Sequence, residues 1–499
     1  MTTTESDAGQ LAKALVPIHG ASFIDGTSVD APSPDQVTSP ATGEVIGSVA
    51  QATAGDVDRA VGAARRAAPA WAALTPADRA AAMRRVAEAV TRHRDELALL
   101  LSLEQGKPYF TEAFAEVDTL IKYFEEAGET ARRLTGFMPA SEDANKRVLV
   151  YRIARGVVGA IQPWNYPLET MGIQVAPALA CGNSVVAVPA PSTSLVAHVF
   201  ARCVEEAELP AGVFNLVIGP GAVVGDALAG HPGVNAIAFT GSTVTGGHVA
   251  RRAAGKPQLL ELGGNGPFVV LDDADLDVVV PAALTSCFYA SGQACTAAER
   301  ILVASGIYDE FAGRLADAVT QQIHLGHSLH RDTVMGPLHN ENGAAKMDRH
   351  VEDAVEKGAV VLAGGNRADR FPTHLYWEPT VLADVTEDML LSSEETFGPI
   401  APLQRIADEA EALELMRRAE YGLATAVFTR DLARGLRFAE RAPAGTVMIN
   451  EASIYLETGF PFGGAPGSSS GIGRAHGAVA MEQVFTDLKT VVVDLGRRL

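Results

Sequence analysis

Three residues far apart in the sequence could together act covalently on a carbonyl compound. Cys295, in Gly-Gln-Ala-Cys-Thr, offers a thiol that could become a nucleophile. Glu261, followed by Leu-Gly-Gly, offers a carboxylate that could serve as a general base. Asn165, in Pro-Trp-Asn-Tyr-Pro, offers a side-chain amide. A cysteine, a glutamate and an asparagine beside a nucleotide-binding loop are what redox chemistry through an acyl intermediate requires.

Each of these residues also has a purely structural explanation. A single cysteine is most often a small buried apolar side chain, and Glu261 could be a surface charge at the end of a helix. Asn165 could form an Asx turn before the Tyr-Pro pair. Glu395, in Glu-Glu-Thr-Phe-Gly-Pro, could be one of two solvated acidic residues. Their chemistry therefore depends on elements that would bring them together.

Two glycine-rich runs could hold the phosphates of a nucleotide. The run from Gly241 to Gly246 directly follows an apolar strand-like run and opens a predicted helix. Its backbone N–H groups, the helix dipole and the Ser242 hydroxyl could hold a pyrophosphate oxygen. The run from Gly219 to Gly225 is the weaker candidate. Its third glycine is one residue late for the dinucleotide fingerprint, and no acidic residue follows at a suitable distance.

The elements that must position these residues alternate between strands and helices. Short β-branched runs predict successive βαβ units of a buried parallel sheet, and these runs are residues 157–161, 184–188, 214–218 and 236–239. A second series comprises residues 268–271, 300–303 and 360–362. The sequence therefore predicts an α/β fold of two lobes, with a nucleotide bound in the first.

Three further segments have local signals. Thr75-Pro76-Ala77-Asp78 predicts the capped start of a helix that continues to about Ser102 and stops at Gly106. The segments 146–153 and 489–495 are strand-like but do not fit either lobe pattern. They could be ordinary edge strands. Alternatively, their exposed edges could pair with another chain, which would imply an oligomer.

Composition excludes several classes of protein. The 499 residues carry a formal net charge of −20, which argues against a nucleic-acid or anionic-membrane partner. The N-terminus has no secretory signal pattern, and the apolar stretches are too short to span a bilayer. Four cysteines do not make a disulfide framework, and no Cys/His spacing indicates a metal site. We expect a reduced, cytoplasmic setting and no metal.

Taken together, the motifs resemble the aldehyde dehydrogenase superfamily. PWNYP, FTGSTVTG, ELGG, GQAC, EETFGP and PFGG occur in the order and spacing of that family, from about residue 20 to the end. The resemblance implies a Rossmann-like cofactor-binding lobe, a catalytic lobe and a small β oligomerisation element. It assigns residues 1–130 and 155–262 to the NAD(P)-binding domain, 263–475 to the catalytic domain, and 131–154 with 476–499 to oligomerisation. A homodimer and a homotetramer both remain open.

The resemblance also implies a role for each residue. Cys295 would attack the aldehyde and carry a thioester, Glu261 would activate the hydrolytic water, and Asn165 with the Cys295 N–H would stabilise the oxyanion. Glu395 would hold the nicotinamide ribose, with Phe397 near the ring. Trp164 would lie near the ribose, and Ser242, between Gly241 and Gly246, would contact the pyrophosphate.

The chain departs from the family pattern at three places. Where the family commonly has Lys-Pro-Ser-Glu near the adenosine ribose, this chain has Val188, Pro189, Ala190 and Pro191. NAD is favoured, but NADP remains possible. Gln174 and Asp487 stand where the family often has a Lys and a Glu of a proton relay. The loop after PFGG, residues 465–469, is longer than usual, which we expect to affect the substrate mouth or the lobe junction.

Motif position also predicts the residues of an aldehyde tunnel. They are Tyr166, Thr170, Ile173, Tyr289, Thr296 and the loop from Glu451 to Phe460, which includes Tyr455. Relatives that oxidise succinate semialdehyde often have an arginine where this chain has Ile173, so an acidic semialdehyde is disfavoured. An uncharged aliphatic or aromatic aldehyde fits best, followed by a semialdehyde or an amino-aldehyde drawn by Glu451 and Glu457. These two carboxylates could equally be solvated loop charges.

Two other functions remain to be weighed against hydrolytic aldehyde oxidation. A CoA-acylating relative would transfer the acyl group to CoA, but Glu261 supplies a base for water. A catalytically silent scaffold protein would be expected to lack Cys295 or Glu261, and both are present. A small-molecule aldehyde, and neither nucleic acid nor membrane, is the expected partner.

Overall fold

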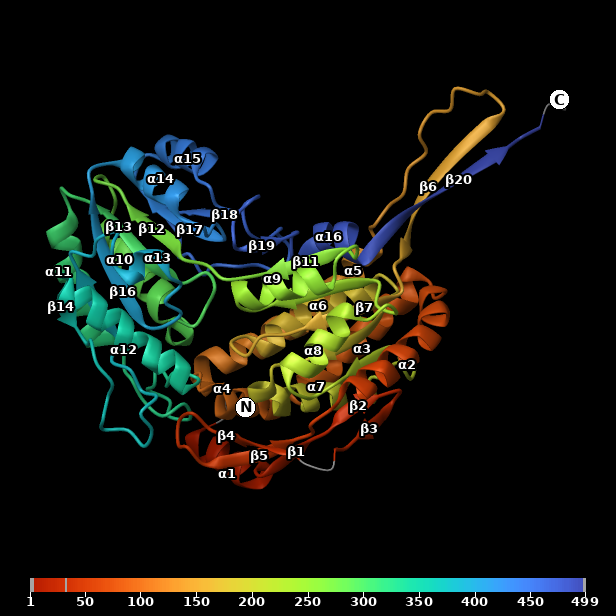
Figure 1. The fold of residues 1–499 in the computed structure, drawn as a ribbon, viewed down its shortest axis with the longest axis horizontal. Helices are drawn as coiled ribbons and strands as arrows, with labels where there is room; N and C mark the ends of the chain where they lie inside the picture. Colours follow the sequence, from red (N-terminus) through yellow and green to blue (C-terminus); the bar gives the residue numbers. More distant parts are fainter. Residues whose placement is uncertain (1–3, 32–33, 497–499) are drawn as a thin grey trace.

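The computed structural model describes residues 4–31 and 34–496, which form two α/β lobes side by side and a projecting arm (Figure 1). The first lobe is built on an eight-stranded sheet whose five central strands are parallel. In spatial order its strands are β19 (Gly471–Ile472), β11 (Gln258–Glu261), β10 (Ala236–Thr240), β7 (Val157–Ile161), β8 (Ser184–Val188), β9 (Phe214–Leu216), β2 (Ser22–Ile24) and β3 (Thr27–Val29). The four predicted strands 157–161, 184–188, 214–218 and 236–239 are thus confirmed, in one parallel sheet.

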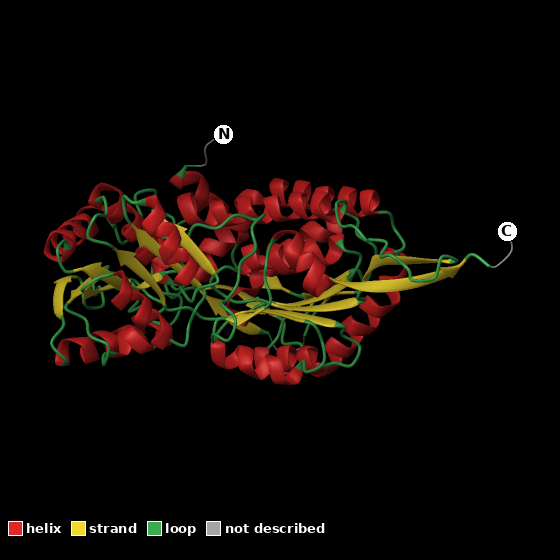
Figure 2. Cartoon of the chain, turned by 90° about the horizontal axis from the view of Figure 1, so that it is seen from above, coloured by secondary structure: helices red, strands yellow, loops and turns green. Residues whose placement is uncertain are grey.

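Helices cover both faces of this sheet (Figure 2). One face is packed by α3 (Pro76–Arg92), α4 (Arg94–Gln105), α5 (Phe114–Ala131), α6 (Pro167–Ala180) and α7 (Ser194–Glu206). The other is packed by α2 (Ala54–Ala72), α8 (Gly221–Gly230) and α9 (Thr243–Arg252). Because both faces are covered, the central strands are buried and read as continuous apolar runs.

The segment predicted as one helix from Thr75 to Ser102 is two helices. Thr75 caps α3 by accepting from the Asp78 N–H, and Gly106, with φ +100°, ends α4, as predicted. The chain leaves helical geometry at His93, whose ring nitrogens contact Glu96 and Glu206, each at 2.9 Å. These side-chain contacts stabilise the break between α3 and α4, which the spacing of apolar residues does not predict.

The second lobe is built on a seven-stranded sheet, parallel except for its edge strand β14. Its order is β14 (Val360–Ala363), β15 (Thr380–Ala383), β16 (Ile400–Ile406), β13 (Ala298–Ala304), β12 (Gly266–Val270), β17 (Ala424–Phe428) and β18 (Thr446–Ile449). Its helices are α10 (Leu276–Phe288), α11 (Tyr308–Gln322), α12 (Glu341–Glu356), α13 (Leu390–Ser393), α14 (Glu409–Arg418) and α15 (Leu432–Arg441). The second predicted series of strands is confirmed as β12, β13 and β14.

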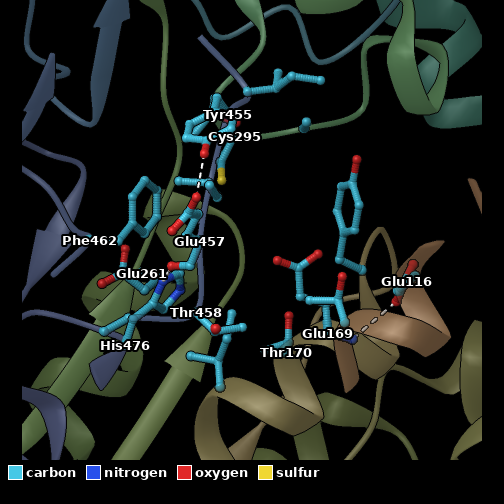
Figure 3. Close-up of a pocket in the computed structure, with 18 of the residues that line it drawn as sticks. Glu116, Glu169, Thr170, Glu261, Cys295, Tyr455, Glu457, Thr458, Phe462 and His476 are labelled. Atoms are coloured by element: carbon cyan, nitrogen blue, oxygen red, sulfur yellow. Dashed lines mark hydrogen bonds between the residues drawn. The ribbon is translucent and has the colours of Figure 1, made fainter. Parts of the chain in front are cut away.

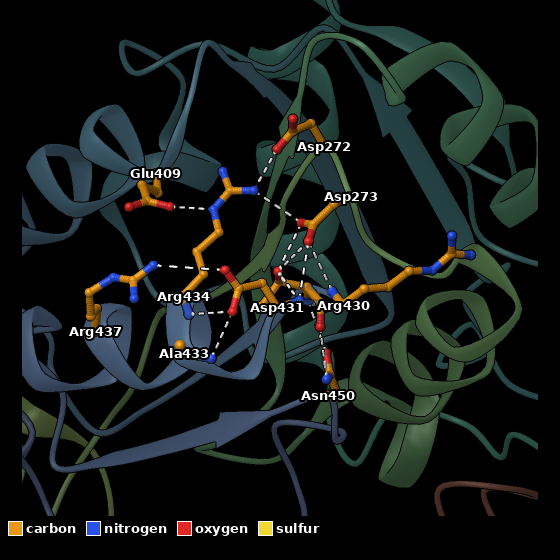
Figure 4. A network of polar contacts seen from close by, with 10 residues as sticks. Asp272, Asp273, Glu409, Arg430, Asp431, Ala433, Arg434, Arg437 and Asn450 are labelled. Carbon is orange, nitrogen blue, oxygen red and sulfur yellow. Dashed lines mark hydrogen bonds and ion pairs between the residues drawn. The ribbon is translucent and has the colours of Figure 1, made fainter.

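A polar network fixes the ends of two neighbouring strands in the second lobe (Figure 4). Asp273, beyond β12, accepts from the Thr429 hydroxyl at 2.7 Å and from the Arg430 N–H at 3.1 Å. Arg434 donates to Asp272 at 2.7 Å and to Asp273 at 3.0 Å. The start of α15 is thereby held against the carboxyl end of the sheet.

A small N-terminal unit lies against the first lobe. It consists of α1 (Glu5–Leu15) and a three-stranded sheet of β1 (Ile18–Gly20), β5 (Val45–Val49) and β4 (Asp35–Thr38). In the range expected for the catalytic domain, β19 joins the first sheet by pairing with β11. The chain therefore returns to the first lobe before its C-terminal segment.

The arm is a two-stranded antiparallel sheet that projects from the first lobe (Figure 1). It pairs β6 (Lys146–Ala154) with β20 (Thr486–Asp494), after the short helix α16 (Gly477–Ala480). The two strand-like segments that fitted neither lobe therefore pair with each other. Several apolar side chains of the arm are exposed, namely Tyr151, Ile153, Leu488, Val492 and Val493.

Among residues 4–31 and 34–496, no helix combines the length and the apolar character needed to cross a membrane.

Candidate active site

The three residues that could do chemistry lie around one cavity of about 420 Å³ (Figure 3). Glu261 ends β11 of the first lobe, Asn165 precedes α6, and Cys295 lies in the loop before β13 of the second lobe. All three line the cavity. The structural explanation of Glu261 as a surface charge is therefore wrong, since it is only 5% exposed.

The Cys295 loop is held in an unusual backbone conformation. Ala290, Ser291 and Gly292 all have positive φ, at 53°, 56° and 69°. The Gln293 side chain donates to the Ala290 carbonyl at 3.1 Å and accepts from the His339 N–H at 2.9 Å. Such a conformation persists only when surrounding contacts impose it. The thiol is therefore preorganised by the loop.

Two glycines allow the lobes to approach at this point. A Cβ on Gly264 would lie 2.1 Å from the Cys295 carbonyl oxygen, and a Cβ on Gly263 would lie 2.8 Å from a Glu395 carboxylate oxygen. The Gly264 N–H donates to that carboxylate at 2.8 Å. Any side chain at these positions would push apart the strand that carries Glu261 and the loop that carries Cys295.

Glu261 is a buried carboxylate without a hydrogen-bond partner. Among the described residues neither of its oxygens is bonded, although Arg474 lies near enough to act on its charge. Burial raises its pKa well above the ordinary range, and the Arg474 charge and the nearby Ala475 backbone N–H oppose the rise. A raised carboxyl pKa brings proton acceptance closer to neutral pH, which suits a general base.

Cys295 differs from the other cysteines in its access to the cavity. Cys181, Cys203 and Cys287 are buried, whereas Cys295 is partly exposed and all four are free. Burial raises the pKa of the Cys295 thiol, and the charges of Glu261 and Glu395 raise it further. The thiol is therefore protonated at rest, and a base or an added positive charge is needed to make it react.

Asn165 is held from both sides. Its side-chain amide donates to the Gln293 carbonyl at 3.0 Å, which leaves a second N–H for another acceptor. Its backbone carbonyl accepts from the Lys107 ammonium at 2.9 Å. The Cys295 N–H has no backbone acceptor in the described chain. These two donors together can hold an oxyanion formed beside the sulfur.

Sequence reasoning missed the buried ion pair beneath this donor. Lys107 and Glu116 are 2.5 Å apart, and each side chain is 1% exposed. Glu116 also accepts from the Leu168 N–H at 2.8 Å, at the start of α6. Nearby, Glu112 accepts from the Ala290 N–H at 3.0 Å, in the Cys295 loop. In the sequence, the run Gly106-Lys107-Pro108 predicts only the end of a helix.

The first glycine-rich run has the geometry of a phosphate site. Ser242 is the N-cap of α9 and accepts from the Thr245 N–H at 3.3 Å, directly after β10. A Cβ on Gly246 would lie 2.2 Å from Leu262, so this glycine lets the helix pack on the chain beyond β11. The second run also opens a helix, α8, but a Cβ on Gly219 would lie 2.7 Å from the Ala52 carbonyl oxygen. Packing therefore explains Gly219.

Residues predicted for the nicotinamide end meet across the lobes. The Trp164 ring stacks on His339 at 4.4 Å between centroids and meets Phe397 edge-on at 5.6 Å. Glu395 is partly buried beside Gly264, and removal of its carboxylate from solvent raises its pKa. Lys346 donates to the Glu395 backbone carbonyl at 2.9 Å. The second Glu395 oxygen could accept from a ribose hydroxyl, and the Trp164 and Phe397 rings could flank the nicotinamide ring.

The region predicted for the adenosine ribose has no charged side chain. Val188 is 1% exposed at the end of β8, and Pro191 is exposed. Ser192 makes a 2.7 Å hydrogen bond with His339. Nothing in residues 188–192 would repel or attract a 2′-phosphate.

The residues predicted for the aldehyde tunnel line the same cavity as Cys295. They are Tyr166, Thr170, Ile173, Tyr289, Thr296 and, from the predicted loop, Glu451, Ala452, Ile454, Tyr455, Leu456, Glu457 and Thr458. Gln174 is buried behind this wall, where it donates to the Thr240 hydroxyl at 3.1 Å.

The expectation for Asp487 is corrected. Asp487 lies on β20 of the arm, where it accepts from Arg155 at 2.9 Å, and it does not line the cavity. Ala475 and His476 are the residues of the C-terminal segment that do. The loop 465–469 lies at the lobe junction: the Ser469 carbonyl accepts from Thr243 at 3.2 Å and its N–H donates to the Glu420 carbonyl at 2.7 Å.

No group of three or more His, Cys, Asp or Glu side chains within the described ranges is arranged to hold a metal ion.

Comparison with known proteins agrees with this geometry. A sequence model of the Aldehyde dehydrogenase family matches residues 29–491. The chain belongs to the aldehyde dehydrogenase family. It is 41% identical to glutarate-semialdehyde dehydrogenase of Pseudomonas aeruginosa, over 92% of this chain and 95% of that one. It is 40% identical to succinate-semialdehyde dehydrogenase [NADP(+)] of Escherichia coli, over 95% and 97% of the two chains.

A solved structure shows the same fold with a cofactor. Betaine aldehyde dehydrogenase of Staphylococcus aureus in complex with NAD+ superposes with a TM-score of 0.93 at 34% identity, over 99% of this chain and 98% of that one. This aldehyde dehydrogenase is accordingly an NAD(P)-dependent oxidoreductase that acts on an aldehyde. The α/β fold and the family membership inferred from the motifs are confirmed.

The buried ion pair gives a prediction on stability. Lys107→Met should lower the free energy of unfolding by about 3–5 kcal/mol, because it leaves the buried Glu116 carboxylate without an opposite charge. Lys122→Met is the control, since Lys122 lies 3.7 Å from Glu126 at the surface and should change stability by less than about 1 kcal/mol. Chemical denaturation of both variants measures the difference, and equal losses would contradict it.

Proposed function

We propose that this aldehyde dehydrogenase oxidises an aldehyde to a carboxylic acid through a thioester on Cys295, which water then hydrolyses. The observation that carries the proposal is the meeting of Cys295, Glu261 and Asn165 at one cavity, although they come from two lobes. In balance, the aldehyde, water and NAD(P)+ give the carboxylate, NAD(P)H and two protons.

The first step forms a carbon–sulfur bond. Water or Glu261 accepts the Cys295 proton, so this step does not require Glu261, and the thiolate attacks the carbonyl carbon. The carbonyl oxygen becomes an oxyanion, held by the free Asn165 amide N–H and the Cys295 backbone N–H. Removing one such donor typically costs about 10²–10³ in rate. The oxyanion then reforms a carbonyl as a hydride leaves the carbon, which gives the thioester.

The cofactor would be held by residues of both lobes. Ser242 and the start of α9 would hold the pyrophosphate, Glu395 the ribose, and Trp164 and Phe397 the walls near the ring. When bound, the oxidised nicotinamide accepts the hydride and places a positive charge near the thiol. NAD is the cofactor we favour, and the uncharged run at 188–192 supports the use of NADP as well.

The second step releases the acid. Glu261, whose buried carboxylate has no other partner, takes a proton from a water that attacks the thioester carbon. The carbon–sulfur bond breaks, and Cys295 leaves as a thiolate that regains a proton. Gln174 cannot carry charge as a lysine would, so water in the cavity is the route for the Glu261 proton.

The cavity walls support an uncharged aliphatic or aromatic body next to the reacting carbon. Tyr166, Ile173 and Tyr289 line this part of the cavity. Two of the three relatives named above are dehydrogenases of glutarate semialdehyde and succinate semialdehyde, which makes an acidic semialdehyde the second candidate. Against it, five glutamates but only one lysine, Lys122, belong to the described lining.

The arm supports self-association. The outer edge of β20 is unpaired within the described chain, whereas β6 is bridged at Val150 by Phe137, and exposed apolar side chains such as Val492 lie along the arm. A second copy of the chain pairing with this arm would cover both.

Replacement of the nucleophile should abolish the reaction. With NAD or NADP and a panel of aldehydes, Cys295→Ala should show no reduced nicotinamide by absorbance, while dinucleotide binding by calorimetry persists. Cys203→Ala, at a buried cysteine, is the control and should keep turnover. Turnover by Cys295→Ala would refute the thioester. Failure of the wild type both to bind dinucleotide and to react with iodoacetamide at Cys295 would favour a silent scaffold.

Replacement of the base should separate the two steps. Glu261→Gln should give a burst of reduced cofactor followed by a steady rate slower by about 10²–10⁴. Wild-type turnover should fall as the pH drops through the raised pKa of Glu261, because only the ionised carboxylate accepts a proton. In Glu261→Gln, turnover should not fall over this pH range. Acyl-CoA as the product when CoA is added would show transfer to CoA rather than hydrolysis.

A single charge should set cofactor choice. Pro191→Glu should raise the KM for NADP about ten-fold relative to NAD, because the carboxylate repels the 2′-phosphate. Pro191→Gln is the neutral control and should leave the ratio unchanged. An equal ratio of the KM for NADP to the KM for NAD in the wild type and both variants would mean that the adenosine ribose does not lie near Pro191.

A further inference from the structure

One carboxylate of the cavity has no part in the proposed reaction. Glu169 lies on the first turn of α6, where its N–H donates to Glu116 at 3.2 Å. Its side chain points into the open part of the cavity, across from Cys295 and Glu457 (Figure 3). The backbone of Glu169 is thus fixed by the buried ion pair while its carboxylate faces the space that a substrate would fill.

The next residue presents a second polar group to the same space. Thr170 is only 3% exposed and lines the cavity beside Glu169. Within the described chain, neither the Glu169 carboxylate nor the Thr170 hydroxyl has a hydrogen-bond or ion-pair partner. Both groups face the space of the cavity and are open to a ligand. A ligand that supplies N–H donors would satisfy both.

The surrounding charges favour a cation. Glu451 and Glu457 line the cavity with Glu169 and Glu261. The nearest ammonium groups already face carboxylates. Lys107 forms a buried ion pair with Glu116, and the exposed Lys122 lies 3.7 Å from Glu126. His476, which also lines the cavity, has its pKa lowered to about 4 by burial and is neutral. A distal carboxylate would meet repulsion here, and an ammonium would meet attraction.

We propose that Glu169 and Thr170 form a subsite for a protonated primary amine at the far end of the aldehyde. The proposal rests on the proposed oxidation at Cys295 and narrows its substrate to an ω-aminoaldehyde. A primary ammonium has three N–H donors, enough for the carboxylate and the hydroxyl together. A quaternary ammonium has none, so it could use the charge of Glu169 but not the Thr170 oxygen.

The charge state of Glu169 agrees with such a ligand. Burial raises its pKa to about 7, Glu116 adds to the rise, and Lys107 opposes it. A bound ammonium would favour the ionised carboxylate. The Glu169 charge also acts on the Cys295 thiol, among the groups that raise its pKa. Glu169 and Cys295 also line the same cavity, so one substrate could contact both.

The first test compares substrates of matched size. We would measure kcat/KM for 3-aminopropanal, butanal, succinate semialdehyde and betaine aldehyde. The wild type should prefer 3-aminopropanal to each of the others. Glu169→Gln should lower the ratio of 3-aminopropanal to butanal by about 10- to 100-fold, the usual worth of a hydrogen bond to a charged group. Thr170→Val should lower it by a smaller factor.

The matched control is Glu205→Gln, at an exposed glutamate of α7 far from the cavity, which should leave the ratio unchanged. Oxidation of butanal by the wild type with no preference for the amine would overturn the subsite and keep the proposed function. A preference for succinate semialdehyde, or an equal loss on both substrates in Glu169→Gln, would also overturn it.

A second test does not depend on turnover. Butylamine, which is protonated at neutral pH and cannot be oxidised as an aldehyde, should slow alkylation of Cys295 by iodoacetamide in the wild type. The protection should be lost in Glu169→Gln, with Glu205→Gln again unchanged. Equal protection in both variants would overturn the subsite even if no aldehyde were turned over. Loss of protection together with a lack of turnover would overturn only the proposed reaction.

Discussion

The approach of two backbone segments determines whether this site exists. The thiol and its base belong to different lobes, and they meet because Gly263 and Gly264 let the chain beyond β11 pass directly against the Cys295 carbonyl. The same passage lets the Gly264 N–H hold Glu395. Cys295, Glu261 and Glu395 are thus placed by one contact at which no side chain is tolerated.

The second determinant is electrostatic and lies beneath the site. The Lys107–Glu116 pair holds the Asn165 carbonyl on one side and the start of α6 on the other. Glu112, four residues before Glu116, fixes the strained loop before Cys295 through the Ala290 N–H. A buried ion pair is costly to form but more costly to break, so this network favours a single arrangement of the oxyanion donors. The same ion pair fixes the backbone of Glu169, because the Glu169 N–H donates to Glu116 on the first turn of α6.

The sequence predicted the parts of the molecule that depend on local pattern. Buried parallel strands have continuous apolar runs, so β7, β8 and β10 could be recognised, and the glycine-rich start of α9 follows directly from β10. Contacts between distant segments could not be recognised. The break at His93 depends on Glu206, and the partner of Asp487 is Arg155 of another strand. Glu169 carried no signal in the sequence, because only its position in the cavity distinguishes it from a surface glutamate.

The arm has a consequence for the order in which the chain acquires its structure. Lys146 of β6 pairs with Asp494 of β20, so the arm joins a segment from the first third of the chain to its very end. During synthesis, β6 leaves the ribosome long before its partner strand exists. The strands of both lobes are synthesised before β20. The arm is therefore completed only once β20 has been made, and until then β6 lacks its partner strand and has only the bridge from Val150 to Phe137.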